Sequence, residues 1–499
     1  MKILKKLDDD HQMAGWAGQK LLRVLAPIGL WVILAGCPAV GPDYVKPDIA
    51  PPSAWYTDLQ DGETDTAVDP RLLAQWWSTL EDPALSGLME RAVSGNLDLK
   101  NASARVREAR ALRNIRRAAL FPAIDATGSV YKYQNSENGI GGGTEGELYS
   151  AGFDANWELD VFGGLRRSEE AAQADLEASW EHLHDVLVSL LAEVALNYTD
   201  VRTYQARFAV AEANIAAQEE TFKFTSSRFE AGLSNELAVQ QALYNLETTR
   251  SQIPNLKTGL AAANNRLSVL LGTPPGAVNR ELADPRPIPV PPVSVAVGVP
   301  ADTLRHRPDV RRSERLLAAQ TARIGVATAD LYPKFFLTGT IGLESISAGD
   351  LFDSASQVWR IGPSVSWRLF DAGAIRQRIE FQNALRDQVS NEYNATILQA
   401  LEEVENALVA YAQEQLRRES LKAATAAAQR AVLLAQDQYI AGLVDFNNVL
   451  IAQRSLLSLQ DELALSEGTV TSNLVRLYKA LGGGWTYPGL PAEEMAAGS

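Results

Sequence analysis

Two stretches of this chain alternate strictly between apolar and polar residues. In residues 151–161 the odd positions are apolar and the even positions are polar or glycine, and residues 359–369 repeat the pattern. A period of two predicts a β-strand, and a run of about ten residues fits a strand that crosses a bilayer with lipid on one face and water on the other. A half-buried strand of a soluble sandwich would show the same alternation, so that alternative stays open at this point.

Most of the remaining chain has apolar residues at helical spacing. No breaker occurs between Gly164 and Gly232, which predicts one helix of roughly 65 residues, about 100 Å long. Apolar residues also recur every seven positions in the segments that return after this helix and after its counterpart, which favours left-handed coiled-coil packing. Only the first returning segment contains a proline, Pro254, and we expect a kink there. The heptad positions are Val239, Leu246, Ile253, Leu260 and Leu267 in one segment and Val449, Leu456, Leu463, Val470 and Leu477 in the other.

The second half of the chain repeats the first with a shift of 210 residues. This shift equals thirty heptads, so the coiled-coil register is the same in both copies. A tandem duplication of this length indicates one structural unit used twice. The matches include Ala231-Gly-Leu233 with Ala441-Gly-Leu443, and Trp157, Leu159 and Arg166 with Trp367, Leu369 and Arg376.

The duplication predicts a chain that is mainly α with a small transmembrane β part. Each repeat should hold a helix, a β-hairpin, one very long helix and a returning helix, with the hairpins near 122–162 and 333–371. Two hairpins cannot close a barrel, and an open strand edge is not tolerated in lipid, so we expect closure by several chains. The expected segments are a signal peptide over 1–36, a lipid-anchored strap over 37–82, repeats over 83–272 and 301–482, a Pro-rich linker over 273–300 and a flexible tail over 483–499.

The N-terminus has the pattern of a secretory signal. A basic region precedes a short apolar run that ends in Leu34-Ala-Gly-Cys37. The run is too short to span a bilayer, and its ending resembles the bacterial lipobox, in which the cysteine is acylated and becomes the first mature residue. Because Pro38 rather than aspartate follows, we expect sorting to the outer membrane. An acidic run just before Met13 is unusual in such a leader, so translation from Met1 and from Met13 both stay open.

Composition mainly excludes functions. The formal net charge of −15 disfavours nucleic acid as a partner, and a single cysteine excludes a disulfide within the chain and a site with several cysteine ligands. His182 and His184 stand two apart on a helix and do not face each other, and neither has a ligand neighbour at metal spacing. The glycine run 139–143 lacks the Lys-Ser/Thr of a P-loop. We therefore expect no catalytic residues, no metal and no cofactor.

Several motifs resemble those of the outer-membrane factors of the TolC/NodT type, the outer-membrane lipoproteins of multidrug efflux systems. The match spans nearly all of the mature chain, and the Arg-Pro-Asp segment together with the lipobox is quite specific. The matching residues are Val40-Gly-Pro-Asp-Tyr44, Gln75-Trp-Trp77, Asp82-Pro-Ala-Leu85, Arg307-Pro-Asp-Val-Arg311, Ala322-Arg-Ile-Gly-Val-Ala327, Asp330-Leu-Tyr-Pro-Lys334, Leu369-Phe-Asp-Ala-Gly373 and Ala452-Gln-Arg454.

This resemblance implies a homotrimer in the outer membrane. Three copies of four strands would form a 12-stranded barrel, and the long helices would continue as a tunnel into the periplasm. The expected function is passive export of drugs or other small molecules, with a periplasmic adaptor and an inner-membrane RND-type pump as partners. Two other functions fit the sequence less well. A lipid-anchored coiled-coil scaffold would not need a lipid-facing hairpin, and a general porin would not need very long heptad helices. The alternative that the chain is the duct of a different secretion system is not excluded by the sequence. The sequence also does not identify the exported compound.

The resemblance also implies a gate where the tunnel closes, beside the second Ala-Gly turn. Members of the family often place an aspartate immediately before Ala-Gln-Arg, and Ile451 replaces it here while Arg454 is retained. Three Ile451 side chains would make an apolar constriction that gates by dewetting. In the alternative, Ile451 packs between helices and the lumen lining lies elsewhere. The candidate gate residues are Asp445, Asn447, Asn448, Ile451 and Arg454.

The polar faces of the two alternating stretches would line the lumen of the barrel. The first is acidic and would give some preference for cations, whereas the second is basic and would offset it. No ion selectivity is predicted from this balance. The candidate lumen residues are Asp154, Asn156, Glu158, Asp160, Arg360 and Arg368.

Overall fold

The computed structural model describes most of the chain from residue 39 onward. The predicted signal peptide over 1–36 and Cys37 lie outside the described residues, as does the part of the predicted tail from 486 onward. No helix in the described part of the chain is both long and apolar enough to cross a membrane. The described residues are 39–48, 52, 54–57, 63–64, 73–140, 142–289, 295–298 and 300–485.

The chain divides into two compact units, each built from several segments. The first comprises Met1–Pro47, Arg107–Ala178 and Glu314–Glu392, and the second comprises Asp48–Val106, Ser179–Ser313 and Tyr393–Ser499.

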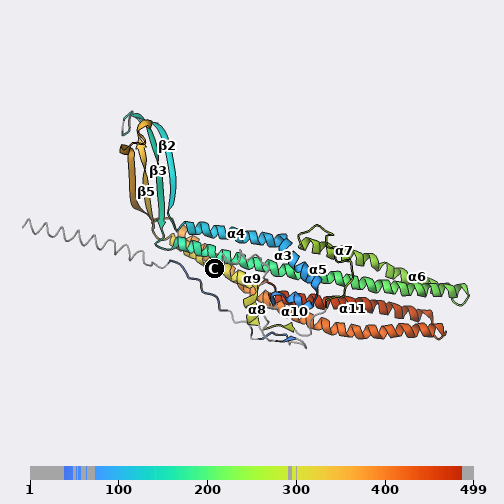
Figure 1. The fold of residues 1–499 in the computed structure, drawn as a ribbon. Helices are drawn as coiled ribbons and strands as arrows, with labels where there is room; N and C mark the ends of the chain where they lie inside the picture. The colour runs from blue at the N-terminus through green and yellow to red at the C-terminus, as the bar shows by residue number, and fades with distance from the viewer. Residues whose placement is uncertain are drawn as a thin grey trace, which may run out of the picture. The chain divides into compact units, whose positions relative to one another are not determined.

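The four longer strands form one antiparallel sheet in the first unit, in the order β2-β3-β5-β6 (Figure 1). Strands β3 and β5 come from different repeats, so the two copies of the duplication pair directly with each other. The prediction of four strands is thus confirmed. Among the described strands, β2 and β6 each have a single neighbour, which leaves one open edge on either side of the sheet. The strands are β2 Ala123–Gln134, β3 Glu145–Leu159, β5 Lys334–Ser345 and β6 Gln357–Ser366.

One face of the sheet presents large apolar side chains that remain exposed. Phe153 on β3 and Trp359 on β6 are 57% and 71% exposed. Both lie within the paired part of their strands, on either side of Ile341 of β5. Their neighbours along the strand point to the opposite, polar face, as the period of two requires. Strand β6 also contains Pro363, which is typical of an edge strand because proline cannot donate to a second neighbour.

Two tryptophans tie the hairpins to the helix that precedes each of them. The indole Nε1 of Trp157 donates to the carbonyl of Leu120 at 2.9 Å, and that of Trp367 donates to the carbonyl of Leu331 at 3.0 Å. The same hydrogen bond therefore occurs once in each repeat. An indole N–H that leaves water needs an acceptor, and here the acceptors are carbonyls that follow a helix end.

Two helices of 67 residues each confirm the predicted long helices: α5 Gly164–Glu230 and α10 Ala374–Ile440. The second copy returns as one continuous helix, α11 Phe446–Ala480. The first copy returns as α6 Glu236–Arg250 and α7 Gln252–Leu270, separated at Ser251. Pro254 lies in the first turn of α7, where its missing N–H has no helical partner to lose, so the expected interruption is confirmed.

Shorter elements complete the chain. Asp82 caps the first of them, α3, by accepting the backbone N–H groups of Ala84 and Leu85. The hairpin connection between β5 and β6 contains two single turns of 3-10 helix, Ala348–Asp350 and Ser354–Ser356. The remaining elements are a 3-10 helix Trp76–Leu80, α3 Pro83–Gly95, α4 Leu97–Ala118, α8 Pro300–His306, α9 Pro308–Ala329 and the parallel two-residue strands β1 Glu63–Thr64 and β4 Val295–Ala296.

The Arg-Pro-Asp segment has a structural role in the second unit. The side chain of Arg307 is buried, and its guanidinium pairs with Asp309 at 2.6 Å and Glu403 at 2.7 Å. It also donates to the carbonyl of Ala480 at 2.8 Å, at the end of α11. A buried charge is tolerated when it is paired in this way, so Arg307, which lies between α8 and α9, joins α9, α10 and α11.

Candidate functional site

The candidate gate lies where the long helices turn back, in the second unit. Both turns use a glycine in the left-handed region, Gly232 at φ 70° and Gly442 at φ 73°. In both, the N–H three residues beyond the end of the helix donates at 2.8 Å to a carbonyl of the last turn, from Leu233 to Arg228 and from Leu443 to Gln438. Glycine adopts this conformation without the steric cost of a Cβ, which explains the repeated Ala-Gly-Leu.

The two turns differ in how the next helix begins. Asn235 caps α6 through its side chain, which accepts the N–H of Ala238 at 3.0 Å. Asp445 occupies the same place before α11, but its carboxylate accepts no helix N–H and is exposed. A carboxylate at this position is favoured by the helix dipole even without a hydrogen bond.

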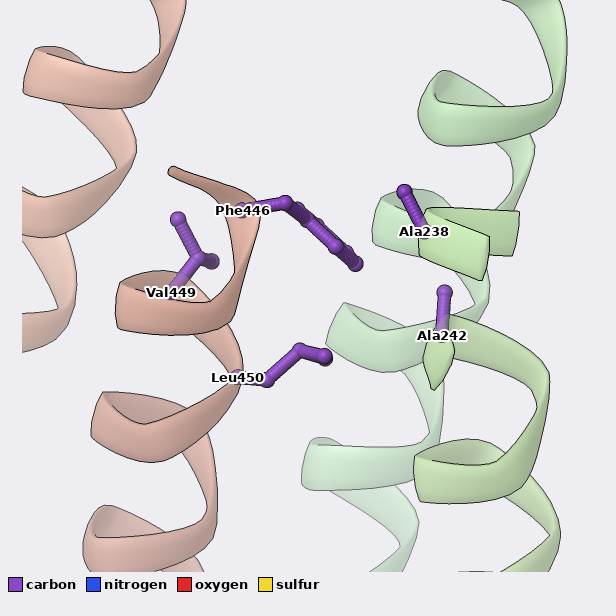
Figure 2. Close-up of a cluster of buried hydrophobic side chains, with 5 residues drawn as sticks. All are labelled: Ala238, Ala242, Phe446, Val449 and Leu450. Atoms are coloured by element: carbon purple, nitrogen blue, oxygen red, sulfur yellow. The ribbon is translucent and has the colours of Figure 1, made fainter. Parts of the chain in front are cut away.

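A small apolar cluster holds α11 against α6 just beyond the turns (Figure 2). Phe446 and Leu450 of α11 point toward Ala238 and Ala242 of α6, and all four are buried. The alanines are small enough to let the two helices approach closely. Partly buried Phe222, Ala435 and Tyr439 pack around the same cluster, so all four helices near the turns contribute.

Arg454 makes a polar contact between the same two helices. Its Nε donates to Oδ1 of Asn245 at 3.0 Å, and its guanidinium carbon lies 4.9 Å from the centre of the Tyr244 ring. Beside it in the sequence, Nε2 of Gln453 donates to the hydroxyl of Thr221 on α5 at 2.9 Å. Arg454 therefore connects the returning helices of the two repeats.

Three other candidate gate residues are exposed on α11, away from the side that carries the apolar cluster. Ile451 is 54% exposed, and Asn447 and Asn448 are exposed as well. Asn447, Ile451 and Arg454 follow each other at helical spacing, so they share one face of the helix. Within a single chain, Ile451 does not pack between helices. Whether it lines a lumen is a property of the assembly, and its role as a gate stays a prediction.

On the polar face of the sheet, one row of polar side chains runs across all four strands. Asp154 on β3 accepts hydrogen bonds from the hydroxyls of Thr127 at 2.8 Å and Thr340 at 2.7 Å. The strand register places Asp125 directly opposite Asp154, and Arg360 directly opposite Thr340. Two like charges thus face each other across β2 and β3, which is destabilising unless nearby donors or cations compensate.

Two of the six candidate lumen residues lie outside the strands. Strand β3 ends at Leu159 and β6 ends at Ser366, so the prediction that the alternating strands include Asp160 and Arg368 is wrong. Asp160 accepts the backbone N–H groups of Leu165 at 3.0 Å and Arg166 at 2.9 Å, at the start of α5. Unpaired N–H groups at a helix start attract a carboxylate. Asp160 therefore caps α5, although its polarity continues the alternating pattern of β3. Asn156 and Glu158 do lie on β3.

Sequence reasoning missed Asp125 and Thr340, which belong to the same row. Their strands were expected, but their faces could be assigned only through the pairing register. The available signal was the alternation within each strand, which places Asp125 and Thr127 on one face of β2.

Comparison with known proteins identifies the family. The model of the family described as "Outer membrane efflux protein" matches residues 88–273 and 299–483, once in each repeat. This chain belongs to the outer membrane efflux protein family. Nodulation protein T of Rhizobium leguminosarum bv. trifolii is 31% identical over 439 residues, which cover 87% of this chain and 91% of that protein. The toluene efflux pump outer membrane protein TtgF of Pseudomonas putida is 31% identical over 467 residues, 92% of this chain and 96% of that protein.

Solved structures of outer-membrane efflux channels share the fold. The outer-membrane channel OprN is 36% identical with a TM-score of 0.85, and the match covers 89% of this chain and 99% of that one. The open state of the Neisseria gonorrhoeae MtrE outer membrane channel is 26% identical with a TM-score of 0.78, covering 91% and 100%. The resemblance, the mainly α fold class and the outer-membrane efflux function expected from the sequence are therefore confirmed.

Proposed function

We propose that this outer membrane efflux protein is the passive outer-membrane duct of a tripartite efflux system and has no enzymatic activity. Three copies close one barrel from their hairpins, and their long helices form the walls of a periplasmic tunnel. A periplasmic adaptor and an inner-membrane RND-type pump supply the exported drugs or other small molecules and the energy. The lipid anchor is Cys37, the first residue after a leader over 1–36.

The sheet supports this proposal most directly. Its outer strands β2 and β6 each have an open edge in the described chain, and one face exposes large apolar side chains such as Trp359. In lipid, open edges must be closed by further strands, and an apolar outer face is stable only against lipid. A soluble scaffold would leave both the edges and this face in water, which is unfavourable.

The oligomeric state tests the proposal. The protein purified from outer membranes in detergent is expected to have the mass of a trimer and to withstand cold SDS. A variant of the outer strand, Ile361→Pro, should lower the yield of this trimer. N–H groups two residues apart in a strand point the same way, so the N–H of Ile361 faces, like Pro363, the open edge at which the next chain would pair. A monomeric wild-type protein in mild detergent would contradict the proposal.

The gate is proposed at the helix turns, with Asp445, Asn447, Asn448, Ile451 and Arg454 as its residues. The exposed face shared by Asn447 and Ile451 supports this, since it is turned away from the chain's own apolar cluster. Ile451→Asp should then change conductance and block by cations, because a ring of carboxylates replaces an apolar ring. If conductance, ion selectivity and efflux all remain at wild-type levels, these residues do not line the gate.

A further inference from the structure

The first described residues of the mature chain have a fixed place in the first unit. The N–H of Val40 donates to the carbonyl of Phe162 at 3.0 Å, three residues after the end of β3. Further on, the hydroxyl of Tyr44 donates to Oε1 of Glu314 at 3.1 Å, and Lys46 pairs with the same carboxylate at 2.9 Å. Residues 39–46 are therefore fastened at both ends to the base of a hairpin and to α9.

One buried arginine donates hydrogen bonds to two backbone carbonyls of this segment. Arg167, in the first turns of α5, has a side chain only 6% exposed. Its Nε donates to the carbonyl of Val40 at 3.2 Å, and one Nη donates to the carbonyl of Ala39 at 3.5 Å and to Asp43 at 2.5 Å. A planar guanidinium can donate to acceptors that lie in different directions, and a lysine ammonium would not replace it here.

The charge of Arg167 is secured by its carboxylate neighbours. Burial alone would lower the pKa of Arg167, but the hydrogen bonds to Asp43 and Glu170 outweigh it and raise the pKa above the ordinary value. The second of these partners, Glu170, lies one turn along α5 at 2.8 Å. The guanidinium is therefore charged and held in one orientation.

Three glycines make room for the segment. A Cβ on Gly163 would lie 2.4 Å from Cβ of Ala39, and one on Gly41 would lie 2.4 Å from Cα of Gly325. A Cβ on Gly325 would in turn meet Cγ of Arg167 at 2.8 Å and the carbonyl of Val40 at 3.0 Å. Two motifs of the sequence, 40–44 and 322–327, thus meet here, and neither takes part in the proposed gate.

We propose that Gly163, Arg167 and Gly325 form an anchor clasp, which holds the start of the mature chain at the base of its own hairpin. Ala39 is two positions beyond Cys37, so the acylated residue lies within about 7 Å of the clasp along the chain. This inference rests on the proposed function, because it takes Cys37 as acylated and the hairpins as entering the outer membrane. The clasp then brings acyl chains and strands to the membrane at the same place, which raises the local concentration of the hairpin at the bilayer.

The proposal makes a specific prediction about the length of the tether between anchor and clasp. Inserting Gly-Ser-Gly-Ser between Pro38 and Ala39 lengthens that tether from two residues to six and leaves every clasp contact in place. Because effective concentration falls as the −3/2 power of tether length, insertion should slow by about fivefold. The readout is the rate at which SDS-resistant trimer appears in outer membranes after a pulse of labelled synthesis.

The matched control places the same four residues between Lys46 and Pro47, beyond the fastened segment. This variant should assemble at the wild-type rate. Equal slowing by both insertions would show that the strap, not the clasp, limits assembly and would overturn the proposal. Wild-type rates for both would overturn it as well.

A second pair of variants tests the clasp through its own contacts. Arg167→Met should speed hydrogen exchange in the peptide containing Val40 by at least about tenfold, since the lost charge-assisted hydrogen bonds each exceed that factor. Acylation of Cys37, followed by intact mass, should be unchanged, and trimer formation should slow as it does for the insertion before Ala39. Unchanged exchange at Val40 would contradict the clasp.

Cys37→Ser separates the clasp from the function on which it rests. If this variant assembles at the wild-type rate, the acyl anchor does not assist insertion and the premise fails. If it assembles slowly while the insertion before Ala39 has no effect, the anchor matters and the clasp proposal alone is wrong.

Discussion

Replacing Arg454 by alanine should loosen the helix turns and open the channel more often. The hydrogen bond from Arg454 to Asn245 and the contact with the Tyr244 ring both join α11 to α6. Arg454 is exposed, so we take the lower end of the range for each contact, about 0.5–1 kcal/mol for the cation–π contact and a similar amount for the hydrogen bond. Their loss, about 1–2 kcal/mol in total, corresponds to a roughly 5- to 30-fold change in an equilibrium constant.

The assay is the open probability of single channels in planar bilayers. If opening separates α11 from α6, Arg454→Ala should raise the ratio of open to closed time by that factor, and Tyr244→Leu should give the part due to the cation–π contact. Arg430→Ala is a matched control on α10, because Arg430 forms no hydrogen bond or ion pair with the described residues. An open probability of Arg454→Ala equal to that of the control would refute the reasoning.

Three further predictions concern stability in the second unit. Gly468→Ala should destabilise the protein by about 1–3 kcal/mol, since a Cβ there would lie 2.0 Å from the hydroxyl of Thr203; Gly87→Ala, with nothing within 4 Å, should instead be neutral or slightly stabilising in a melting experiment. Phe446→Ala should lower the unfolding free energy by about 3–5 kcal/mol and speed hydrogen exchange at the turns, and unchanged exchange would contradict the cluster in Figure 2. Burial and two nearby arginines lower the pKa of His182, so stability should be full above about pH 6.5 and fall as pH drops through the lowered value; His182→Gln should remove this loss of melting temperature between about pH 7 and 5.

The sign of the pH effect follows from the surroundings of His182. Its Nε2 lies 3.3 Å from a guanidinium nitrogen of Arg105, which can only donate, so the neutral ring accepts there. Protonation would place two donors against each other, and Arg312 adds a second positive charge. The folded protein therefore binds this proton less tightly than the unfolded chain.

Periodicity in the sequence was sufficient for the large elements. The stretch without a breaker after Gly164 predicted α5 to within a few residues, and the duplication predicted its counterpart α10. Alternation predicted β3 and β6, and the expected hairpins implied their partner strands. The ends of elements rest on single side chains and were less accessible. Asp160 continued the alternation of β3 by its polarity, yet its carboxylate caps α5.

Contacts between distant segments were not predictable from these patterns. The hydrogen bonds of Arg167 with the strap and of Arg454 with α6 join residues far apart in the chain, and no local period encodes such pairs. The same holds for Asp125 beside Asp154, which depends on the register of β2 against β3. Motifs such as 40–44 and 322–327 marked the positions involved without showing that they meet.

Single-channel conductance of the detergent-purified protein, measured together with its oligomeric mass, tests the proposed duct most directly. The proposed function predicts a trimer with one low-conducting pore per trimer, and the proposed gate predicts a higher open probability for Arg454→Ala. A monomer that produces no current, or a trimer that remains silent in wild-type and Arg454→Ala forms alike, would contradict the assignment of this chain as an outer-membrane duct.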